Sequence, residues 1–472
     1  MTTKKQKLFS DTLLYMIGNF GSKTISFFLI PFYTRYLNTA EYGIMDFVNT
    51  TKSLILPFIY LQIIDGVYRY LLDSKYERKK QIISSSFFFV VLMIFLSLVL
   101  FYSGVIIVDP SIEYINLITA MFTMSIFNSL FRQILRGLDR LKLYSISGII
   151  TTFFIGMLNI YFIGFLNMSY NGMILATTIS LSISSLVILV YGGIYKYINL
   201  KSINKKILYS LIKYSIPLLP NGISWWFMNV SDRYLISYFL NFEYLGIYAI
   251  ANKFASVIYL FNTIFYQAWQ TSAIDEFESE NKNEYYTEIF NYLLNFQLIL
   301  VLLGTISVRL FIQFLVGAEF VSAWEYTPIL FLAAMFNSFS AFYGTGYLSA
   351  KNTIKAFSTT SIGALVNILV NIILIPKFGL MAASLSTLMS YLVVWIVRVY
   401  TTKNYFEIEI NYKKLFSGLL LIFISSIVNY LNSTFLIIVF DAIIILIMFS
   451  INRYFISEIY KKIKLYLGNF EK

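Results

Sequence analysis

Long apolar segments recur along the whole chain and alternate with short polar ones. Each is about 20 residues long, the length that an α-helix needs to cross the hydrocarbon core of a membrane. We therefore expect an all-α polytopic membrane protein. The pattern predicts about 14 transmembrane helices, at residues 11–34, 44–66, 83–107, 114–135, 143–164, 173–195, 214–237, 247–270, 287–308, 327–349, 354–375, 380–400, 412–431 and 433–452.

Short motifs from the first part of the chain return in the second part. The pair LN at 37–38 returns at 240–241, and the triplet FNS at 127–129 returns at 336–338. Internal repeats of this kind are typical of transporters, whose substrate sites lie between the repeats. We expect two pseudo-symmetric six-helix lobes followed by two further helices and a basic tail, with the boundaries 1–205, 206–402 and 403–472.

Basic residues gather in alternate connecting segments. Most of the 36 Lys and Arg, Arg398 among them, fall in segments that are cytoplasmic if the N-terminus is inside. The external segments then hold Arg35, Arg309 and Lys377. Cytoplasmic loops of membrane proteins carry this excess of cations. The pattern predicts that both ends are cytoplasmic, with a retained first helix in place of a cleaved signal peptide.

Several cations fall inside the apolar segments or at their edges: Lys23, Lys52, Arg69, Arg233 and Lys253. A cation at the bilayer centre costs about 3 kcal/mol even on the lenient insertion scale. Such residues are expected to face a water-filled cavity or a counter-charge. We therefore predict an anion site between the helices. For Arg69 the alternative is contact with the lipid headgroups, and for Arg233 it is pairing with Asp232.

Polar side chains also follow one face of four predicted helices, namely 11–34, 44–66, 214–237 and 247–270. These helices are the best candidates for lining a central cleft. The alternative is that the polar residues only pack and hydrogen-bond between helices. Besides the cations, the predicted substrate-binding residues are Asn19, Asn49, Trp225, Asn252, Tyr259, Tyr266 and Gln270.

Composition argues against an enzyme. The chain is 58% hydrophobic and 13% charged, and it has neither Cys nor His, so the usual zinc, haem and thiolate sites are not expected. No Gly is followed by Lys, which excludes the phosphate-binding loop of ATPases. We expect no cofactor and no metal. The net charge of +12 follows from the loop cations, so it does not indicate nucleic acid.

Four segments resemble the Wzx-type flippases for lipid-linked oligosaccharides: 30–50, 135–150, 231–254 and 261–274. The third reads SDRYLISYFLNFEYLGIYAIANKF. These flippases belong to the MOP superfamily, with the MATE exporters and the lipid II flippases. The resemblance implies two six-helix lobes in a V shape with two extra helices. It also implies a multi-pass protein of the bacterial cytoplasmic membrane.

For function, the resemblance implies a flippase that moves an undecaprenyl-diphosphate-linked repeat unit to the outer leaflet by alternating access. The product would be a surface polysaccharide: O-antigen, capsule or exopolysaccharide. Related flippases hold the diphosphate with cavity cations, and Lys23, Lys52 and Lys253 resemble those in position. Expected partners are membrane lipids, a polysaccharide polymerase and a chain-length regulator.

Transport is expected to use an ion gradient, of H⁺ or Na⁺, and not ATP. The candidate ion-coupling carboxylates are Asp46, Asp65 and Asp232. The alternative function is a MATE-like exporter of small organic molecules. Its usual cationic substrates call for acidic cavity residues, whereas cations dominate here. A membrane polymerase or ligase is a third alternative, but the chain has no large external loop.

Overall fold

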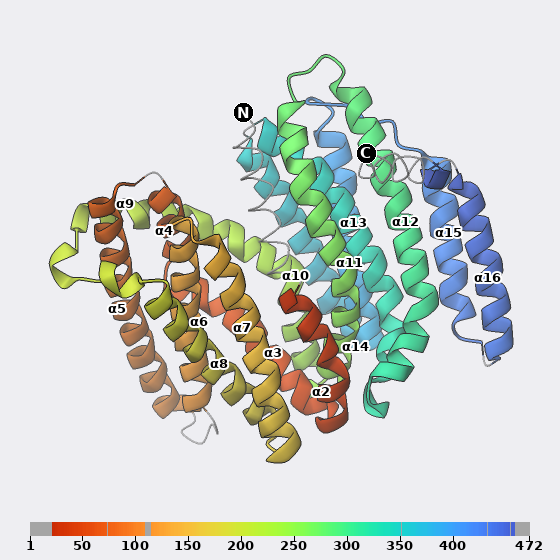
Figure 1. The fold of residues 1–472 in the computed structure, drawn as a ribbon. Coiled ribbons are helices and arrows are strands. Elements are labelled where there is room, and N and C mark those ends of the chain that lie inside the picture. The colour runs from red at the N-terminus through yellow and green to blue at the C-terminus, as the bar shows by residue number, and fades with distance from the viewer. Residues whose placement is uncertain are drawn as a thin grey trace, which may run out of the picture. The chain divides into compact units, whose positions relative to one another are not determined.

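A computed structural model describes residues 21–457 of the chain, except 73, 109–114, 351, 432 and 454. The described residues form helices and connecting loops, and no strand occurs among them. They divide into two compact units, Met1–Trp226 and Phe227–Lys472 (Figure 1). The predicted boundaries at 205 and 402 stay predictions, and the last helices belong to the second unit.

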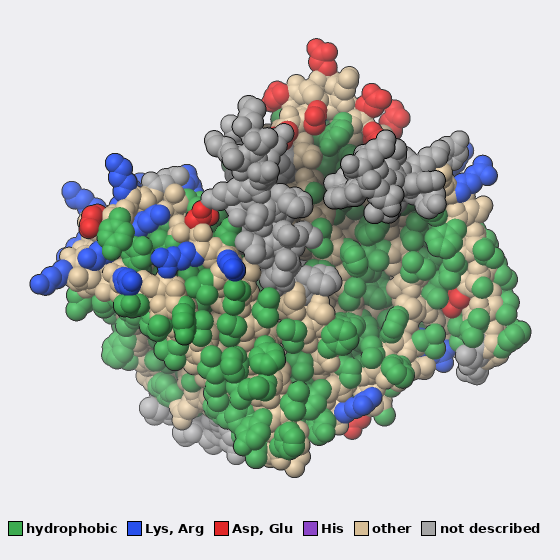
Figure 2. Space-filling model, in the orientation of Figure 1, with side chains coloured by type: hydrophobic (Ala, Val, Ile, Leu, Met, Phe, Trp, Pro, Cys, Tyr) green, Lys and Arg blue, Asp and Glu red, His purple; other side chains and the backbone are tan. Residues whose placement is uncertain are grey.

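The helices are those of a membrane protein. Seven of the described helices are long and apolar enough to span a membrane, or eight if one bent pair counts as a single span. Large apolar side chains cover much of the face shown in Figure 2. The expected fold class, an all-α polytopic membrane protein, is confirmed. The count of 14 and the orientation stay predictions.

The described part of the first unit starts with a helical stretch at 21–28, and the unit ends inside α10. In its centre α4, α5 and α6 surround a hydrophobic core, while α6 and α7 pack against α8. Its helices are α2 (Ile30–Tyr36), α3 (Thr39–Ile59), α4 (Ile63–Leu72), α5 (Tyr76–Val108), α6 (Ile115–Gly137), α7 (Leu141–Asn159), α8 (Tyr170–Tyr191), α9 (Lys205–Ser215) and α10 (Leu219–Phe239), with the short turns η1 (Ile160–Phe165), η2 (Ile194–Tyr197), η3 (Leu200–Ser202) and η4 (Ile216–Leu218).

The span predicted at 44–66 is broken in the structure. The axes of α3 and α4 differ by 62°, and the connection holds Leu61 (φ 48°) and Gln62 (φ 53°) in the left-handed region. Pro57 lies inside α3 just before the break. Proline has no N–H for the helix ladder and crowds the preceding turn, so a kink nearby is expected physically.

A short amphipathic helix, α9, precedes the seventh predicted span. Leu211 and Ser215 on one face are buried, whereas Lys205, Lys206 and Lys213 are exposed. At 11 residues α9 is too short to cross a bilayer. It ends at η4, where Pro217 stands in the first turn. The sequence pattern did not predict it as a separate helix.

The second unit is built around α13. This helix packs against α11, α12 and α14, and most of its side chains are buried. The last two helices pack on each other and on α12 (Figure 1). The helices are α11 (Phe242–Asp275), α12 (Lys282–Leu315), α13 (Ala323–Ser349), α14 (Thr353–Thr401), α15 (Tyr412–Val428) and α16 (Thr434–Ile451), with the turn η5 (Ala318–Phe320).

The long helix α14 is a folded-back hairpin. Gly379, with φ 57° and ψ −136°, interrupts it. The Ser390 Oγ donates to the Gly363 carbonyl at 2.7 Å, and the Ser386 Oγ donates to the Asn371 Oδ1 at 2.6 Å. These bonds join residues on opposite sides of Gly379, so the two halves run antiparallel. The halves correspond to the spans predicted at 354–375 and 380–400.

The repeat seen in the sequence has a counterpart in local structure. The side chain of Asn38 caps the start of α3, and that of Asn241 caps the start of α11. Further along the same helices, the Nδ2 groups of Asn49 and Asn252 each donate at 3.0 Å to the carbonyl four residues earlier. The two predicted repeats thus begin these helices in the same way.

Candidate substrate-binding site

Lys52 lies at a polar cavity inside the first unit. The cavity has a volume of about 320 Å³ and takes residues from α3, α6, α7 and α8. The Lys52 Nζ donates to the Asn49 Oδ1 at 3.0 Å and forms no ion pair with any described residue. The lining residues are Lys52, Ser53, Leu56, Pro57, Tyr60, Ser125, Asn128, Ser129, Ile155, Thr177 and Leu181.

Helical spacing explains why these residues share one cavity. Lys52 and Leu56 of α3 and Tyr60 directly after its end follow one another at intervals of four positions, so they lie on one face of the helix. On α6, Ser125 and Ser129 are separated in the same way. The cavity lining therefore combines an ammonium from α3 with hydroxyl and amide groups from α6. An ammonium has three N–H donors, and Asn49 uses one.

Asn128 is the functional candidate that the sequence did not single out as a site residue. It is buried, and its Nδ2 donates to the Ser184 Oγ at 3.1 Å and the Ser185 Oγ at 3.3 Å. These bonds hold α6 against α8 beside the cavity. Its place in the repeated FNS motif was the signal that could have found it.

The other predicted residues of the first unit are not part of this cavity lining. Lys23 and Arg69 are exposed, and Asp46 is half-buried on α3. Asp65 accepts hydrogen bonds from the Gln62 Nε2 at 2.6 Å and the Gln133 Nε2 at 3.3 Å. Asn49 contacts Lys52 as described above. Asn19 lies outside the described residues.

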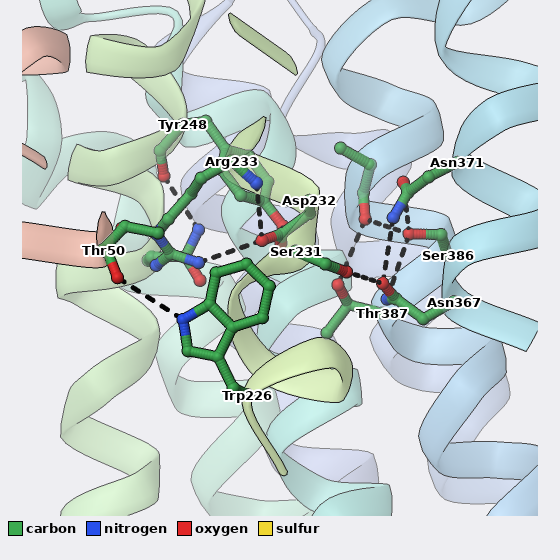
Figure 3. A network of polar contacts seen from close by, with 12 residues as sticks. Thr50, Trp226, Ser231, Asp232, Arg233, Tyr248, Asn367, Asn371, Ser386 and Thr387 are labelled. Carbon is green, nitrogen blue, oxygen red and sulfur yellow. Dashed lines mark hydrogen bonds and ion pairs between the residues drawn. The ribbon is translucent and has the colours of Figure 1, made fainter. Parts of the chain in front are cut away.

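The prediction named Trp225, but the tryptophan side chain that the structure describes here is that of the next residue, Trp226. The side chain of Trp225 lies outside the described part of the chain. Trp226 is buried, and its Nε1–H donates to the Ser53 Oγ at 3.2 Å and the Thr50 carbonyl at 3.4 Å (Figure 3). Trp226 therefore ties the start of α10 to the cavity face of α3.

In the second unit, Asp232 is held by two neighbours. Arg233 forms an ion pair with it, with the Nη1 and the Oδ1 3.1 Å apart, and the backbone N–H of Arg233 donates to the same oxygen at 2.9 Å. The hydroxyl of the buried Tyr248 donates to the Oδ2 (Figure 3). The side chain of Asp232 is 3% exposed, whereas that of Arg233 is 14% exposed. The predicted pairing of these two residues is present.

A network of neutral side chains adjoins this pair. The Ser231 Oγ donates to the Asn367 Oδ1 at 3.1 Å, and the Asn371 Nδ2 donates to the same oxygen at 3.0 Å (Figure 3). The Asn371 Oδ1 in turn accepts from Ser386. These residues are buried, and they connect α10 to both halves of the α14 hairpin.

The polar stripe of α11 lies on the face that the core of the second unit does not cover. Lys253 is exposed, whereas Asn252, Tyr259, Tyr266 and Gln270 are partly exposed. Because polar side chains are costly against lipid, this face is expected to border water. Tyr259, in the middle of the stripe, is also hydrogen-bonded to the buried Tyr391.

Comparison with known proteins identifies the family. The sequence pattern of the family described as polysaccharide biosynthesis protein matches residues 8–270, more than half of the chain. The chain belongs to the polysaccharide biosynthesis protein family. Over 221 residues it is 22% identical to a Haloferax volcanii protein named as a probable low-salt glycan biosynthesis flippase, Agl15; the match covers 45% of each chain. The chain spans less than half the length of the sequence relatives that it matches.

Solved structures show the same fold. The lipid II flippase MurJ in an inward closed conformation matches with a TM-score of 0.71 and 17% identity, covering 96% of this chain and 99% of that one. An inward-facing MATE multidrug transporter of the MOP superfamily matches with a TM-score of 0.64 and 12% identity, covering 82% of this chain and 94% of that one. The predicted MOP-type fold and multi-pass membrane location are confirmed for this family member.

One cation of this polysaccharide biosynthesis protein is placed differently from the prediction. Arg398, counted above as a loop cation, is 6% exposed and lies inside the second unit. Its guanidinium donates to the Ser340 carbonyl at 2.7 Å, the Thr360 Oγ1 at 3.0 Å and the Thr359 Oγ1 at 3.1 Å. Gly344 gives it room, since a Cβ there would be 2.7 Å from the Arg398 Nη1. Arg398 therefore joins α13 to both halves of α14.

Proposed function

We propose that this family member is a flippase for an undecaprenyl-diphosphate-linked oligosaccharide, used in surface polysaccharide assembly. One observation carries the proposal: Lys52 is an ammonium at a polar cavity within an apolar helix, without a described carboxylate partner. The membership in a polysaccharide biosynthesis family and the fold shared with a lipid II flippase support it. The substrate would be moved to the outer leaflet by alternating access.

The chemistry of the cavity suits a diphosphate. Phosphate oxygens are strong acceptors, and hydrogen bonds to charged groups contribute about 1.5–3 kcal/mol each. Lys52 has two further N–H donors, and the hydroxyls of Ser125 and Ser129 lie on the same cavity lining. A cationic drug would be repelled by this ammonium, which argues against a MATE-like exporter of cations.

The remaining predicted residues take proposed roles within their own units. Lys23 and Arg69 in the first unit, and Arg233 and Lys253 in the second, are proposed as further phosphate ligands during transport. The polar stripe of α11, which includes Tyr266, is proposed to bind the sugars. Its aromatic rings can pack on the sugar rings, and its amide groups can hydrogen-bond the sugar hydroxyls. Trp225 and Asn19 keep their proposed roles as substrate ligands.

Energy is proposed to come from an ion gradient. Of the three candidate carboxylates, Asp232 is the best supported, since it is deeply buried and already balances a cation, Arg233. A buried carboxylate can bind a proton or Na⁺ in exchange for such a partner. Asp46 and Asp65 are proposed as weaker candidates, and Asp65 is already hydrogen-bonded to two glutamines.

The flippase proposal is tested in vesicles that contain the purified protein and a fluorescent undecaprenyl-diphosphate-linked oligosaccharide. A membrane-impermeant reductant measures how much label reaches the outside. Lys52→Ala should lower substrate affinity about ten- to hundredfold, because one charge-assisted bond is lost. Lys52→Arg should keep partial activity, since it keeps the charge and changes the geometry.

The matched control is Lys403→Ala, which removes an exposed loop lysine and should leave transport unchanged. The proposal fails if the folded wild-type protein moves no lipid-linked oligosaccharide, or if Lys52→Glu transports as well as the wild type. Export of cationic dyes by the wild type in the same vesicles, without oligosaccharide transport, would favour the MATE-like alternative.

A further inference from the structure

The first unit carries a further cavity, an apolar groove lined by residues of α5, α6 and α8 and by the η2 segment. The groove has a volume of about 530 Å³, within the range of small-molecule sites. Its floor is aromatic. The ring of Phe87 of α5 stacks on the ring of Phe131 of α6, with the ring centres 6.2 Å apart. It is lined by Phe87, Met124, Phe127, Phe131, Ser182, Ser185, Leu186, Leu189, Tyr195 and Ile198. Leu186 at its side is 60% exposed, as expected for a side chain that faces lipid.

One end of the groove is closed by the η2 segment, which bears cations. Tyr195 and Ile198 line the groove, and the Lys196 Nζ lies 5.8 Å from the centre of the Tyr195 ring. The side chains of Arg140 and Lys196 both lie next to Gly193 (φ 55°). A Cβ at Gly193 would be 3.4 Å from the Arg140 Nη1 and 4.0 Å from the Lys196 Cδ. The guanidinium of Arg140 also donates to the Gly192 carbonyl.

Hydrogen bonds to α5 hold this rim in place. The Ser84 Oγ of α5 donates to the Tyr197 carbonyl at 2.6 Å and accepts from the Asn199 N–H at 3.0 Å. The Ser85 Oγ accepts from the Asn204 N–H at 2.9 Å. Both serines are buried, so η2 and η3 are fixed to α5 and hold Lys196 at the end of the groove.

Cations outnumber carboxylates in the chain segment that forms the rim. The chain has no Asp or Glu between Asp139 and Asp232, and seven cations lie there. Figure 2 shows Lys and Arg side chains gathered at the upper left of the view, over α5 and α9. Among the described residues, the carboxylates at this end of the first unit include Glu77 at the start of α5 and Asp139 beside Arg140, and both are exposed. The cations are Arg140, Lys142, Lys196, Lys201, Lys205, Lys206 and Lys213.

We propose that this groove is a binding site for an anionic phospholipid. One acyl chain would lie on the aromatic floor between α5, α6 and α8, and the headgroup phosphate would meet Lys196 and Arg140 at the rim. An apolar groove that ends in a cationic rim matches a molecule with a hydrocarbon chain and a negative head. Basic surface segments attract anionic lipids in the same way. The site is separate from the Lys52 cavity and does not depend on the proposed transport.

The test uses the chain's lack of cysteine. Leu186→Cys is labelled with a bimane fluorophore, and the delipidated protein is titrated with phosphatidylglycerol that carries a nitroxide on its acyl chain. We expect quenching at concentrations at least about fivefold lower than for phosphatidylcholine with the same chains. Lys196→Ala should remove about fivefold of the affinity for phosphatidylglycerol and leave phosphatidylcholine unchanged. Lys196→Arg should keep the preference.

Two controls separate the causes. Lys413→Ala removes an exposed lysine of the second unit and should change nothing. Ser182→Trp fills the groove and should abolish quenching by both lipids. Equal quenching by the two lipids in the wild type, or an unchanged preference in folded Lys196→Ala, overturns the proposal. Displacement of phosphatidylglycerol by equimolar undecaprenyl diphosphate would instead assign the groove to the transported lipid and would also overturn it.

Discussion

At the scale of single residues, Asp232 is the carboxylate whose loss should reveal ion coupling. Its negative charge pairs with Arg233 and accepts the Tyr248 hydroxyl. Asp232→Asn keeps the shape of the side chain but cannot balance a cation. We therefore expect transport in vesicles to lose its response to an imposed H⁺ or Na⁺ gradient, while transport without a gradient continues. The measurement compares rates with and without each gradient.

Breaking a buried ion pair can also unfold a protein, since the partner's charge is left unbalanced at a cost of about 3–5 kcal/mol. The double variant Asp232→Asn/Arg233→Gln removes both charges. It leaves no unbalanced charge in the unit, so it should fold and its transport can be measured. Glu319→Gln is the matched control, because it removes an exposed carboxylate that is not among the candidate coupling residues. Normal gradient dependence in the folded double variant would show that Asp232 does not couple transport to an ion.

The sequence predicted the roles of single charged residues less well than it predicted the fold. Hydropathy shows that Lys52 and Arg398 adjoin apolar segments, but not the direction in which each side chain points. Lys52 turns to a polar cavity, as expected for a functional cation. Arg398 instead turns into the unit and is satisfied by neutral acceptors on α13 and α14. Only the packing of neighbouring helices distinguishes these two cases.

At the scale of the elements, Gly379 decides how α14 is built. A straight helix of 49 residues would be about 73 Å long, more than twice the ~30 Å core of a membrane. The chain therefore has to turn, and Gly379 turns it with a φ of 57° and a ψ of −136°. Gly379→Ala should destabilise the protein by about 1–3 kcal/mol, because this backbone conformation strains any residue with a Cβ. Thermal unfolding of the purified protein measures the effect.

Gly222→Ala in α10 is the matched control. A Cβ has open space within 4 Å at both glycines, but the backbone of Gly222 is helical. The control should therefore be neutral or slightly stabilising, since alanine is the better helix former. Equal melting temperatures for Gly379→Ala and the wild type would contradict the role given to this turn.

The turn of α14 was predicted from the sequence, and the α3–α4 break was not, although Pro57 was a signal for it. The predicted gap between the spans 354–375 and 380–400 contains Gly379, because Pro376, Lys377 and glycine interrupt the apolar pattern there. The predicted span 44–66 runs through this break, because the residues around Pro57 are mostly apolar and Leu61 and Gln62 are not residues that favour a positive φ. Helix α9 was missed for a different reason: its apolar face is too short for a span, and it falls mostly in the connecting segment between the predicted spans 173–195 and 214–237.

At the scale of the whole molecule, the internal repeat is visible in packing within each unit. Asn128 of α6 hydrogen-bonds Ser184 of α8, and Asn337 of α13 is hydrogen-bonded to Tyr391 in the second half of α14. Both asparagines belong to the FNS motif found in the sequence. The cations do not follow the repeat, because the residue that matches Lys52 in the LN alignment is Ala255. The repeat therefore describes the scaffold, while the charged residues are particular to each unit.

The topology of the whole chain, 14 spans with both ends in the cytoplasm, is also a prediction that can be tested. Single cysteines are placed at four exposed positions, Lys205, Glu319, Lys377 and Lys403, and cells are treated with a membrane-impermeant maleimide. We expect labelling at 319 and 377 and none at 205 and 403 until the cells are opened, because basic connecting segments stay inside. Positions 377 and 403 form an internal check: the second half of α14 separates them by about 22 helical residues, or roughly 33 Å, enough to cross the membrane once. Labelling of 205 or 403 from outside would show that the orientation is wrong, and labelling of 377 and 403 from the same side would show that the second half of α14 does not span.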